Sequence, residues 1–139
     1  MIQKFLDIII RTDGQKLYNF TNHIEQWIIK NSFKNGILNI SIQHTSASLI
    51  VQENADPDVQ SDLLSYFDKL VPMNNDLYKH TTEGKDDMPA HIKSALTNNQ
   101  ISLSIKESKL LLGTWQGIYL FEHRINHQNR MIILHYLGN

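Results

Sequence analysis

The alternation of apolar and polar residues in the last third of the chain constrains the fold more than any other feature. From Ile101 to the end, a period of two predicts strands at 101–105, 109–112, 116–124 and 130–137. Turns are expected at Glu107-Ser108 and over 126–129, where the alternation breaks. This end of the chain therefore predicts a largely antiparallel sheet.

Helical periodicity occurs in three places before residue 100. After a turn at Thr12-Asp13-Gly14, apolar residues recur at helical spacing to about residue 30. Asp56-Pro57 joins a helix-capping residue to a proline suited to the first helical position, which predicts a helix over about 57–69. Met88-Pro89 opens a short helix through Leu96, whereas 74–87 has no period and is expected to be a loop. Further strands are expected at 1–11, 38–42 and 47–51.

Length and composition place these elements in one α+β unit. A chain of 139 residues, 41% of them hydrophobic, is long enough for one packed core and too short for two typical domains, so residues 1–139 are expected to form a single compact domain. The net charge of -1 without blocks of like charge argues against a nucleic-acid partner. No run approaches the roughly 18 apolar residues of a membrane span. Asp7 interrupts the apolar start, which therefore does not resemble a signal peptide, and we expect a soluble cytoplasmic protein.

The absence of cysteine narrows the chemistry, because it removes disulfides, thiolate metal sites and cysteine nucleophiles together. Metal sites would have to use histidine and carboxylate ligands. His80 and His91 are candidates, because Glu83, Asp86 and Asp87 fall between them. This neighbourhood favours zinc or a similar divalent ion, although the spacing matches no zinc signature. The alternative is a solvated loop histidine at 80 and an exposed one in the first helical turn at 91.

His44 follows the strand over 38–42 in phase with its apolar residues and is followed by the hydroxyls of Thr45, Ser46 and Ser48. It could be a ligand or a general base, or a histidine whose ring nitrogens are satisfied by those hydroxyls. A hydrolytic set of His44, Ser46 and a carboxylate is a further, weaker alternative.

The segment 116–124 carries more polar groups than a plain core strand needs. If extended, it places Gln116, Glu122 and Arg124 on one face and His123 on the other. An amide, a carboxylate and a guanidinium on one half-buried surface suit a polar ligand. A structural pair of Glu122 and Arg124 at a sheet edge is an equally good interpretation.

Glu53-Asn54 directly follows the apolar run 47–51, at a strand end where ligands often gather. Asp56 in the same segment is explained as a helix cap, worth on the order of 1 kcal/mol. Glu53 and Asn54 are not explained by the cap.

Five motifs in order along the chain resemble the YjbQ family. They are HTSASL at His44–Leu49, ENADPDV at Glu53–Val59, YKHTTEG at Tyr78–Gly84, DDMPAHIKS at Asp86–Ser94 and GTWQGIYLFEHR at Gly113–Arg124. The resemblance runs nearly end to end. It implies a compact α+β fold assembled as a homotrimer, a histidine cluster that can hold a metal, and a secondary thiamine-phosphate synthase activity.

Residue by residue, the resemblance implies three groups of site residues. The metal ligands would be His44, His80 and His91. The catalytic residues would be Glu53, Asp87, Glu122 and Arg124. The substrate-binding residues would be Ser46, Asn54, Lys93, Trp115 and Gln116. His123 is left out, because the family motif is free at that position and the alternation turns it away from Glu122 and Arg124.

The implied reaction joins an aminopyrimidine diphosphate to a thiazole phosphate, with pyrophosphate leaving. Arg124, Lys93 and a divalent ion would neutralise the leaving group, and Trp115 would stack on the pyrimidine. Glu53 or Glu122 would bind the amino group. No glycine-rich phosphate loop is present, which indicates a side reaction of a site built for another substrate. The alternative function is a trimeric protein that binds a metal or a small anion without turnover.

Overall fold

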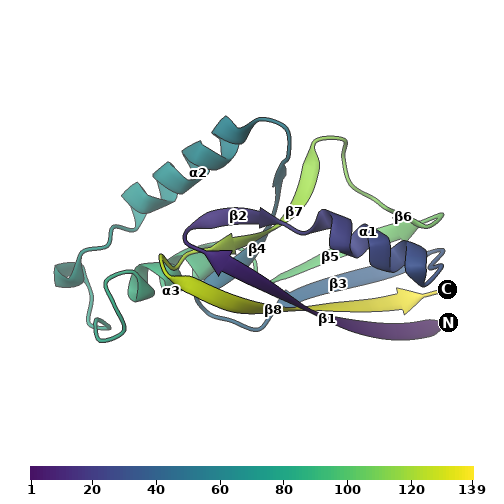
Figure 1. The fold of residues 1–139 in the computed structure, drawn as a ribbon, viewed down its shortest axis with the longest axis horizontal. Coiled ribbons are helices and arrows are strands. Elements are labelled where there is room, and N and C mark those ends of the chain that lie inside the picture. The colour runs from purple at the N-terminus through teal and green to yellow at the C-terminus, as the bar shows by residue number, and fades with distance from the viewer.

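The computed structural model describes all residues from 1 to 139. The fold is built on two antiparallel sheets (Figure 1). The larger sheet has the order β1 (Ile2–Asp13), β8 (His127–Gly138), β3 (Gly36–Ile42), β5 (Gln100–Lys106), β6 (Lys109–Leu110). The smaller sheet has the order β2 (Lys16–Asn19), β7 (Gln116–Glu122), β4 (Ala47–Glu53). The helices are α1 (Thr21–Lys30), α2 (Pro57–Leu70) and α3 (Asp87–Leu96), with a short 3₁₀ turn η1 (Asn75–Leu77). The predicted α+β class is confirmed, and none of the helices combines the length and apolar character needed to cross a bilayer.

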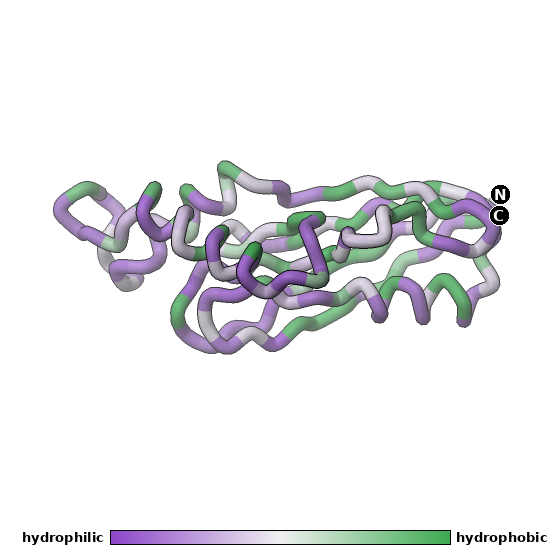
Figure 2. Tube along the Cα trace, turned by 90° about the horizontal axis from the view of Figure 1, so that it is seen from above, coloured by the Kyte–Doolittle hydropathy of each residue, from purple (hydrophilic) through white to green (hydrophobic).

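The main core lies between the two sheets and under α1. Inward positions of β8 alternate along the strand, with Ile132, Leu134 and Tyr136 fully buried. Trp27 and Ile28 of α1 belong to the same cluster. Figure 2 shows the resulting alternation of apolar and polar stretches along the strands of an elongated molecule. The pattern is that of sheets with one face turned to the core.

β7 is buried on both faces, which explains its unusual composition. Ile118 and Leu120 face the main core, whereas Tyr119 and Phe121 form a second cluster with Leu17. That second cluster also includes Leu63, Leu64 and Phe67 of α2, so the helix packs on the outer face of the smaller sheet. The predicted alternation of this segment is therefore confirmed.

Several predicted boundaries differ from the structure. The helix predicted to start after Gly14 begins only at Thr21, because residues 16–19 form β2 and pair with β7 from Lys16↔Glu122 to Asn19↔Tyr119. The strand predicted over 109–112 is only Lys109–Leu110, and β8 begins at His127, inside the predicted turn. The helix at Pro57 forms as predicted, with Asp56 Oδ1 accepting the Asp58 N–H at 2.9 Å.

Candidate metal centre

His80, Asp87 and His91 bring three ligand atoms within 4.8 Å of one another. The Nε2 atoms of His80 and His91 lie 2.7 and 3.1 Å from the same Oδ2 of Asp87. Two tetrahedral zinc ligands with bonds of about 2.0–2.1 Å stand about 3.3 Å apart. The 3.1 Å separation of His91 and Asp87 is close to this value, whereas the 2.7 Å separation of His80 and Asp87 is that of a hydrogen bond. His91 and Asp87 share a face of α3 because they are four residues apart, and His80 comes from the preceding loop.

The hydrogen bond on the far side of His91 supports a metal ligand. Its Nδ1 lies 3.0 Å from the carbonyl oxygen of Thr45, which can only accept, so Nδ1 carries the hydrogen. In the neutral ring, Nε2 then directs a lone pair at a carboxylate oxygen, an arrangement that a cation between the two atoms would stabilise. A ring N–H bound to a backbone carbonyl is also the usual support of a metal-binding histidine.

Arg124 fixes Asp87 from the opposite side. Its Nη1 donates to Asp87 Oδ1 at 2.6 Å, its Nε donates to Asp86 Oδ2 at 2.9 Å, and Nη2 donates to the Glu83 carbonyl at 3.0 Å. Burial alone would raise the pKa of the Asp87 carboxyl, but the His80 hydrogen bond and the Arg124 charge outweigh it and hold that pKa below its usual value. Asp87 is therefore an oriented carboxylate with Oδ2 turned to the histidines.

Gly84 shapes the loop that delivers His80. Its φ of +102° is strained for other residues, and a Cβ there would lie 2.9 Å from Asp86 Oδ1. If the cluster binds zinc, we expect Gly84→Ala to weaken that binding about tenfold, because the change displaces the carboxylate that helps to hold Arg124. Gly14→Ala is the matched control, since Gly14 also has a positive φ, +91°, and a Cβ there meets only the Ile125 carbonyl. Equal zinc affinity in both variants, measured by chelator competition, would contradict this role.

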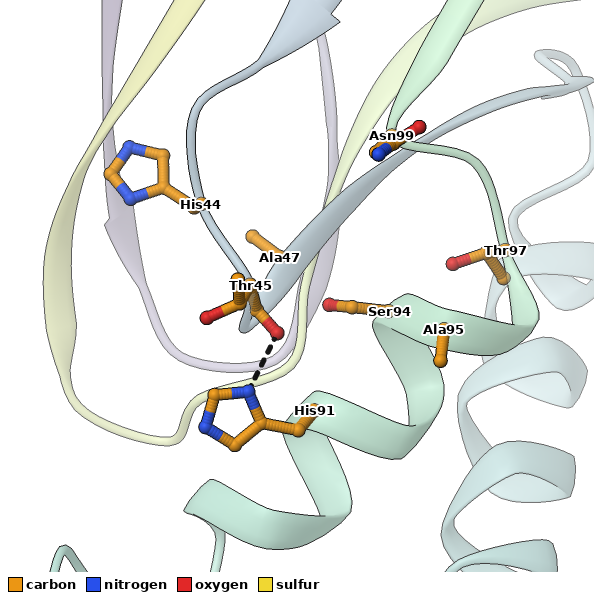
Figure 3. Close-up of a pocket in the computed structure, with 8 residues that line it drawn as sticks. All are labelled: His44, Thr45, Ala47, His91, Ser94, Ala95, Thr97 and Asn99. Carbon is orange, nitrogen blue, oxygen red and sulfur yellow. Dashed lines mark hydrogen bonds between the residues drawn. The ribbon is translucent and has the colours of Figure 1, made fainter.

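A cavity of about 340 Å³ opens beside His91 (Figure 3). Its lining is small and uncharged apart from the two imidazoles: His44, Thr45, Ala47, His91, Ser94, Ala95, Thr97 and Asn99. The Ser94 hydroxyl is buried without a partner. The cavity therefore offers neutral hydrogen-bonding groups, with His91 shared between it and the metal centre.

His44, predicted as a third metal ligand, lines this cavity and does not join the cluster. Its Nε2 accepts the Met131 N–H at 2.8 Å. Burial, together with the Arg130 charge, lowers the pKa of its ring. Asp87 provides the third ligand atom of the cluster in place of His44.

Glu122 and Ser46 lie in the interior and belong to a different group. Glu122 is fully buried, and both of its oxygens accept from Arg130, at 2.8 Å from Nε and 2.6 Å from Nη2. Thr12 donates to the same carboxylate at 2.5 Å, and Arg130 Nη2 also donates to Ser46 Oγ at 3.0 Å. The predicted shared surface of Glu122 and Arg124 is therefore absent, because Glu122 pairs with Arg130 and Arg124 pairs with the two aspartates.

Four other predicted residues lie at the far end of the smaller sheet. Glu53 pairs with Gln116 in the ladder between β4 and β7. This pair lies six residues along the ladder from the pair Ala47↔Glu122, a distance of about 20 Å at strand spacing. The Gln116 side chain accepts the Gly113 N–H at 2.7 Å, and Asn54 donates to the Gln116 carbonyl at 3.4 Å. Trp115 is 62% exposed. Within one chain, this group is separate from the metal centre.

Lys93 is also held by another residue. Its Nζ lies 2.6 Å from Asp68 Oδ1, and the residue is 2% exposed.

The structure thus brings together His80, Asp87, His91 and Arg124 from the predicted set. Sequence reasoning missed Arg130, although it stands in phase with the buried Ile132 and Leu134 of β8, which is the signal that could have found it.

His123 is a buried histidine outside the cluster and affects stability. Its Nε2 lies 2.8 Å from Ser48 Oγ, its Nδ1 has no partner, and burial with the charges of Lys93 and Arg130 lowers its pKa from 6.5 to about 3. The unfolded chain therefore binds a proton below pH 6.5 that the folded chain does not. We expect the wild type to lose about 2 kcal/mol more unfolding free energy than His123→Gln between pH 7 and pH 5. The unfolding free energy of both proteins is measured by urea unfolding at each pH. An equal loss in the wild type and in His123→Gln would contradict this assignment.

The fold and the cluster define a small two-sheet α+β protein with a histidine–aspartate centre. The sequence pattern of the family described as "UPF0047 protein YjbQ-like" matches residues 7–139, so the chain belongs to the YjbQ family. A UPF0047 protein from Synechocystis is 47% identical over 131 residues, which cover 94% of this chain and 89% of the relative. The YjbQ protein of Salmonella typhimurium is 49% identical over 98 residues, 70% of each chain.

Solved structures agree with the fold. A crystal structure of a YjbQ/UPF0047 family protein from Clostridium acetobutylicum matches with a TM-score of 0.87 at 32% identity, covering 95% of this chain and 99% of the other. A YjbQ-like protein from Sulfolobus solfataricus matches with a TM-score of 0.86 at 25% identity, covering 99% and 100%. The family resemblance of the sequence is thereby confirmed.

Proposed function

We propose that the protein binds a divalent cation, zinc or a similar ion, through His80, Asp87 and His91, and acts there on a small phosphorylated molecule. The observation that carries this proposal is the convergence of three ligand atoms within 4.8 Å, with His91 supported through its Nδ1 by the Thr45 carbonyl and Asp87 by Arg124. Three protein ligands that leave an open position are typical of catalytic zinc sites. A cation bound there would supply positive charge for phosphate oxygens.

The ion pairs formed by the nearby cationic side chains support the assignment of the phosphate charge to a bound cation. Arg124 donates to two aspartates and a carbonyl, and Lys93 is buried against Asp68. Both are engaged in ion pairs, and we propose that they do not neutralise the diphosphate directly. Arg124 is a positioning residue that orients Asp87, and the charge on a phosphate is assigned to the bound cation.

Thiamine-phosphate synthesis is the reaction we propose to test at this site. The thiazole nitrogen would form a bond to the methylene carbon of the aminopyrimidine as the carbon–oxygen bond to the diphosphate breaks and pyrophosphate leaves. The uncharged cavity lining suits the flat aminopyrimidine, with Thr45, Ser94 and Asn99 available for hydrogen bonds. The diphosphate would lie toward His91 and the cation.

The test incubates zinc-loaded protein with both precursors and measures thiamine phosphate. We expect product from the wild type and from His135→Ala, a control that changes a histidine on β8 bound to Gln3. We expect His91→Ala to form at least about 100-fold less product, because it removes a cation ligand and a wall of the cavity. Equal product from His91→Ala and wild type would overturn the assignment of the site.

The second candidate function is a binding protein that holds a metal or a small anion without turnover. It is favoured by the engagement of Arg124 and Lys93 in ion pairs and by the absence of a glycine-rich phosphate loop. Stoichiometric zinc with no product in the same assay would support this alternative over the synthase.

We also propose that the chain forms a homotrimer and acts in the cytoplasm. The outer face of the larger sheet supports assembly, because Phe5, Ile9 and Ile37 are each more than half exposed there. We expect light scattering on the eluting protein to give three times the chain mass of 16.1 kDa. A single-chain mass at micromolar concentration would contradict the trimer.

A further inference from the structure

A second cavity, of about 420 Å³, lies beside β2 and the start of α1. It shares no lining residue with the cavity beside His91. Its wall is formed by Ile10, Lys16, Leu17, Tyr18, Asn19, Phe20, His23, Asn54, Gln60 and Tyr119. Asn54, one of the residues predicted to bind substrate, therefore lies here and not at the metal centre.

The wall of this cavity carries a buried hydroxyl and several amide donors. Tyr119 is 2% exposed, and its hydroxyl contacts the Glu53 carbonyl at 3.3 Å and the Gln60 amide at 3.5 Å. Asn19 is engaged within the wall, because its Oδ1 accepts from Thr21, at 3.0 Å from N and 2.7 Å from Oγ1, and its side chain also hydrogen-bonds to the Tyr119 hydroxyl. The bonds from Gln60 and Asn54 are long, at 3.5 and 3.4 Å, so both amides can turn to a ligand.

Gly117 allows these groups to lie close together. A Cβ at this position would come within 3.0 Å of the Tyr119 ring, 3.2 Å of its hydroxyl and 3.3 Å of Asn19 Nδ2. The second glycine of the GTWQG motif is thereby explained as a packing position behind this cavity, a role that the metal centre does not require.

The lining of the cavity carries the positive charge of Lys16, and the Glu53 carboxylate lies nearby, since burial and the Glu53 charge both raise the pKa of the Tyr119 hydroxyl. Lys16 and His23 are its only ionisable groups besides the two tyrosines, they form no ion pair, and no carboxylate lines it. The first turn of α1, which carries His23, has no acidic residue. The remaining wall is apolar, from Ile10, Leu17 and Phe20.

We propose that this cavity is a second binding site, for a small phosphate monoester with an apolar or aromatic body. Lys16, His23 and the amides of Asn54 and Gln60 contact the phosphate, and Tyr18 with the apolar wall contacts the body. The site is independent of the metal centre and of any reaction there.

The test uses metal-free protein labelled with ¹⁵N and phenyl phosphate as the probe, with inorganic phosphate and phenol in parallel. We expect saturable shifts of the side-chain amide signals of Asn54 and Gln60 with phenyl phosphate. Inorganic phosphate should bind more weakly, and phenol should leave those signals unshifted. Failure of phenyl phosphate to saturate these signals, or equal binding of phenol, would overturn the proposal.

Three variants locate the site. We expect Lys16→Gln to weaken phenyl phosphate binding about tenfold, because a charged donor is lost. Lys109→Gln, the same change on an exposed lysine of β6, should leave the affinity unchanged, and so should His91→Ala at the metal centre. Equal weakening by Lys109→Gln would show non-specific attraction, and loss of binding in His91→Ala would place the ligand at the metal centre; either result overturns the proposal.

Discussion

Replacing Arg130 by methionine is expected to lower the free energy of unfolding by about 3–5 kcal/mol. The change removes the guanidinium that donates to both oxygens of Glu122, at 2.8 and 2.6 Å, and leaves a fully buried carboxylate without its partner charge. The loss is measured by urea unfolding at fixed protein concentration, because assembly would make the result depend on concentration.

The control for this prediction removes both charges. Glu122→Leu with Arg130→Met leaves no buried ion, so we expect this double variant to recover most of the lost stability. A loss below about 1 kcal/mol in Arg130→Met alone would contradict the description of the pair as buried and mutually dependent. A double variant no more stable than Arg130→Met would contradict its electrostatic explanation.

Replacing Asp87 by asparagine is expected to weaken zinc binding by at least about 100-fold. The amide keeps the shape of the side chain but removes the negative charge at the oxygen that faces both imidazoles. Asp86 continues to hold Arg124 at 2.9 Å, so the loop should keep its position. The affinity is measured by competition with a chromophoric chelator.

Asp68→Asn is the matched control, because it makes the same chemical change on α2, where Asp68 pairs with Lys93. We expect zinc affinity there to equal that of the wild type. If Asp87→Asn also bound zinc like the wild type, the carboxylate would be a structural partner of Arg124 and not a ligand.

Much of the fold was predictable because its determinants are local. Asp56 and Pro57 mark the start of α2, and the alternation along 116–124 placed Ile118 and Tyr119 on opposite faces, as observed. The short strand β2 was not predictable in this way. Leu17 fits the helical spacing of α1, but it is buried through pairing with Phe121, more than a hundred residues away in sequence.

The site shows the same division between local and distant determinants. His80, Asp87 and His91 are close in sequence, and the carboxylates between the histidines pointed to a metal-binding segment. The partners of the arginines depend on tertiary packing, since Arg124 meets Asp86 and Asp87 across 37–38 residues and Arg130 meets Glu122 across the turn between β7 and β8. The other motifs lie at both ends of the smaller sheet because β4 and β7 are antiparallel. This pairing cannot be deduced from any single motif.

Anomalous diffraction at the zinc edge, from crystals of protein purified with zinc, tests the central claim most directly. We expect one strong peak per chain, bound by Nε2 of His80, Nε2 of His91 and Oδ2 of Asp87. A peak at other residues, or no peak while these three side chains keep their positions, would contradict the metal centre.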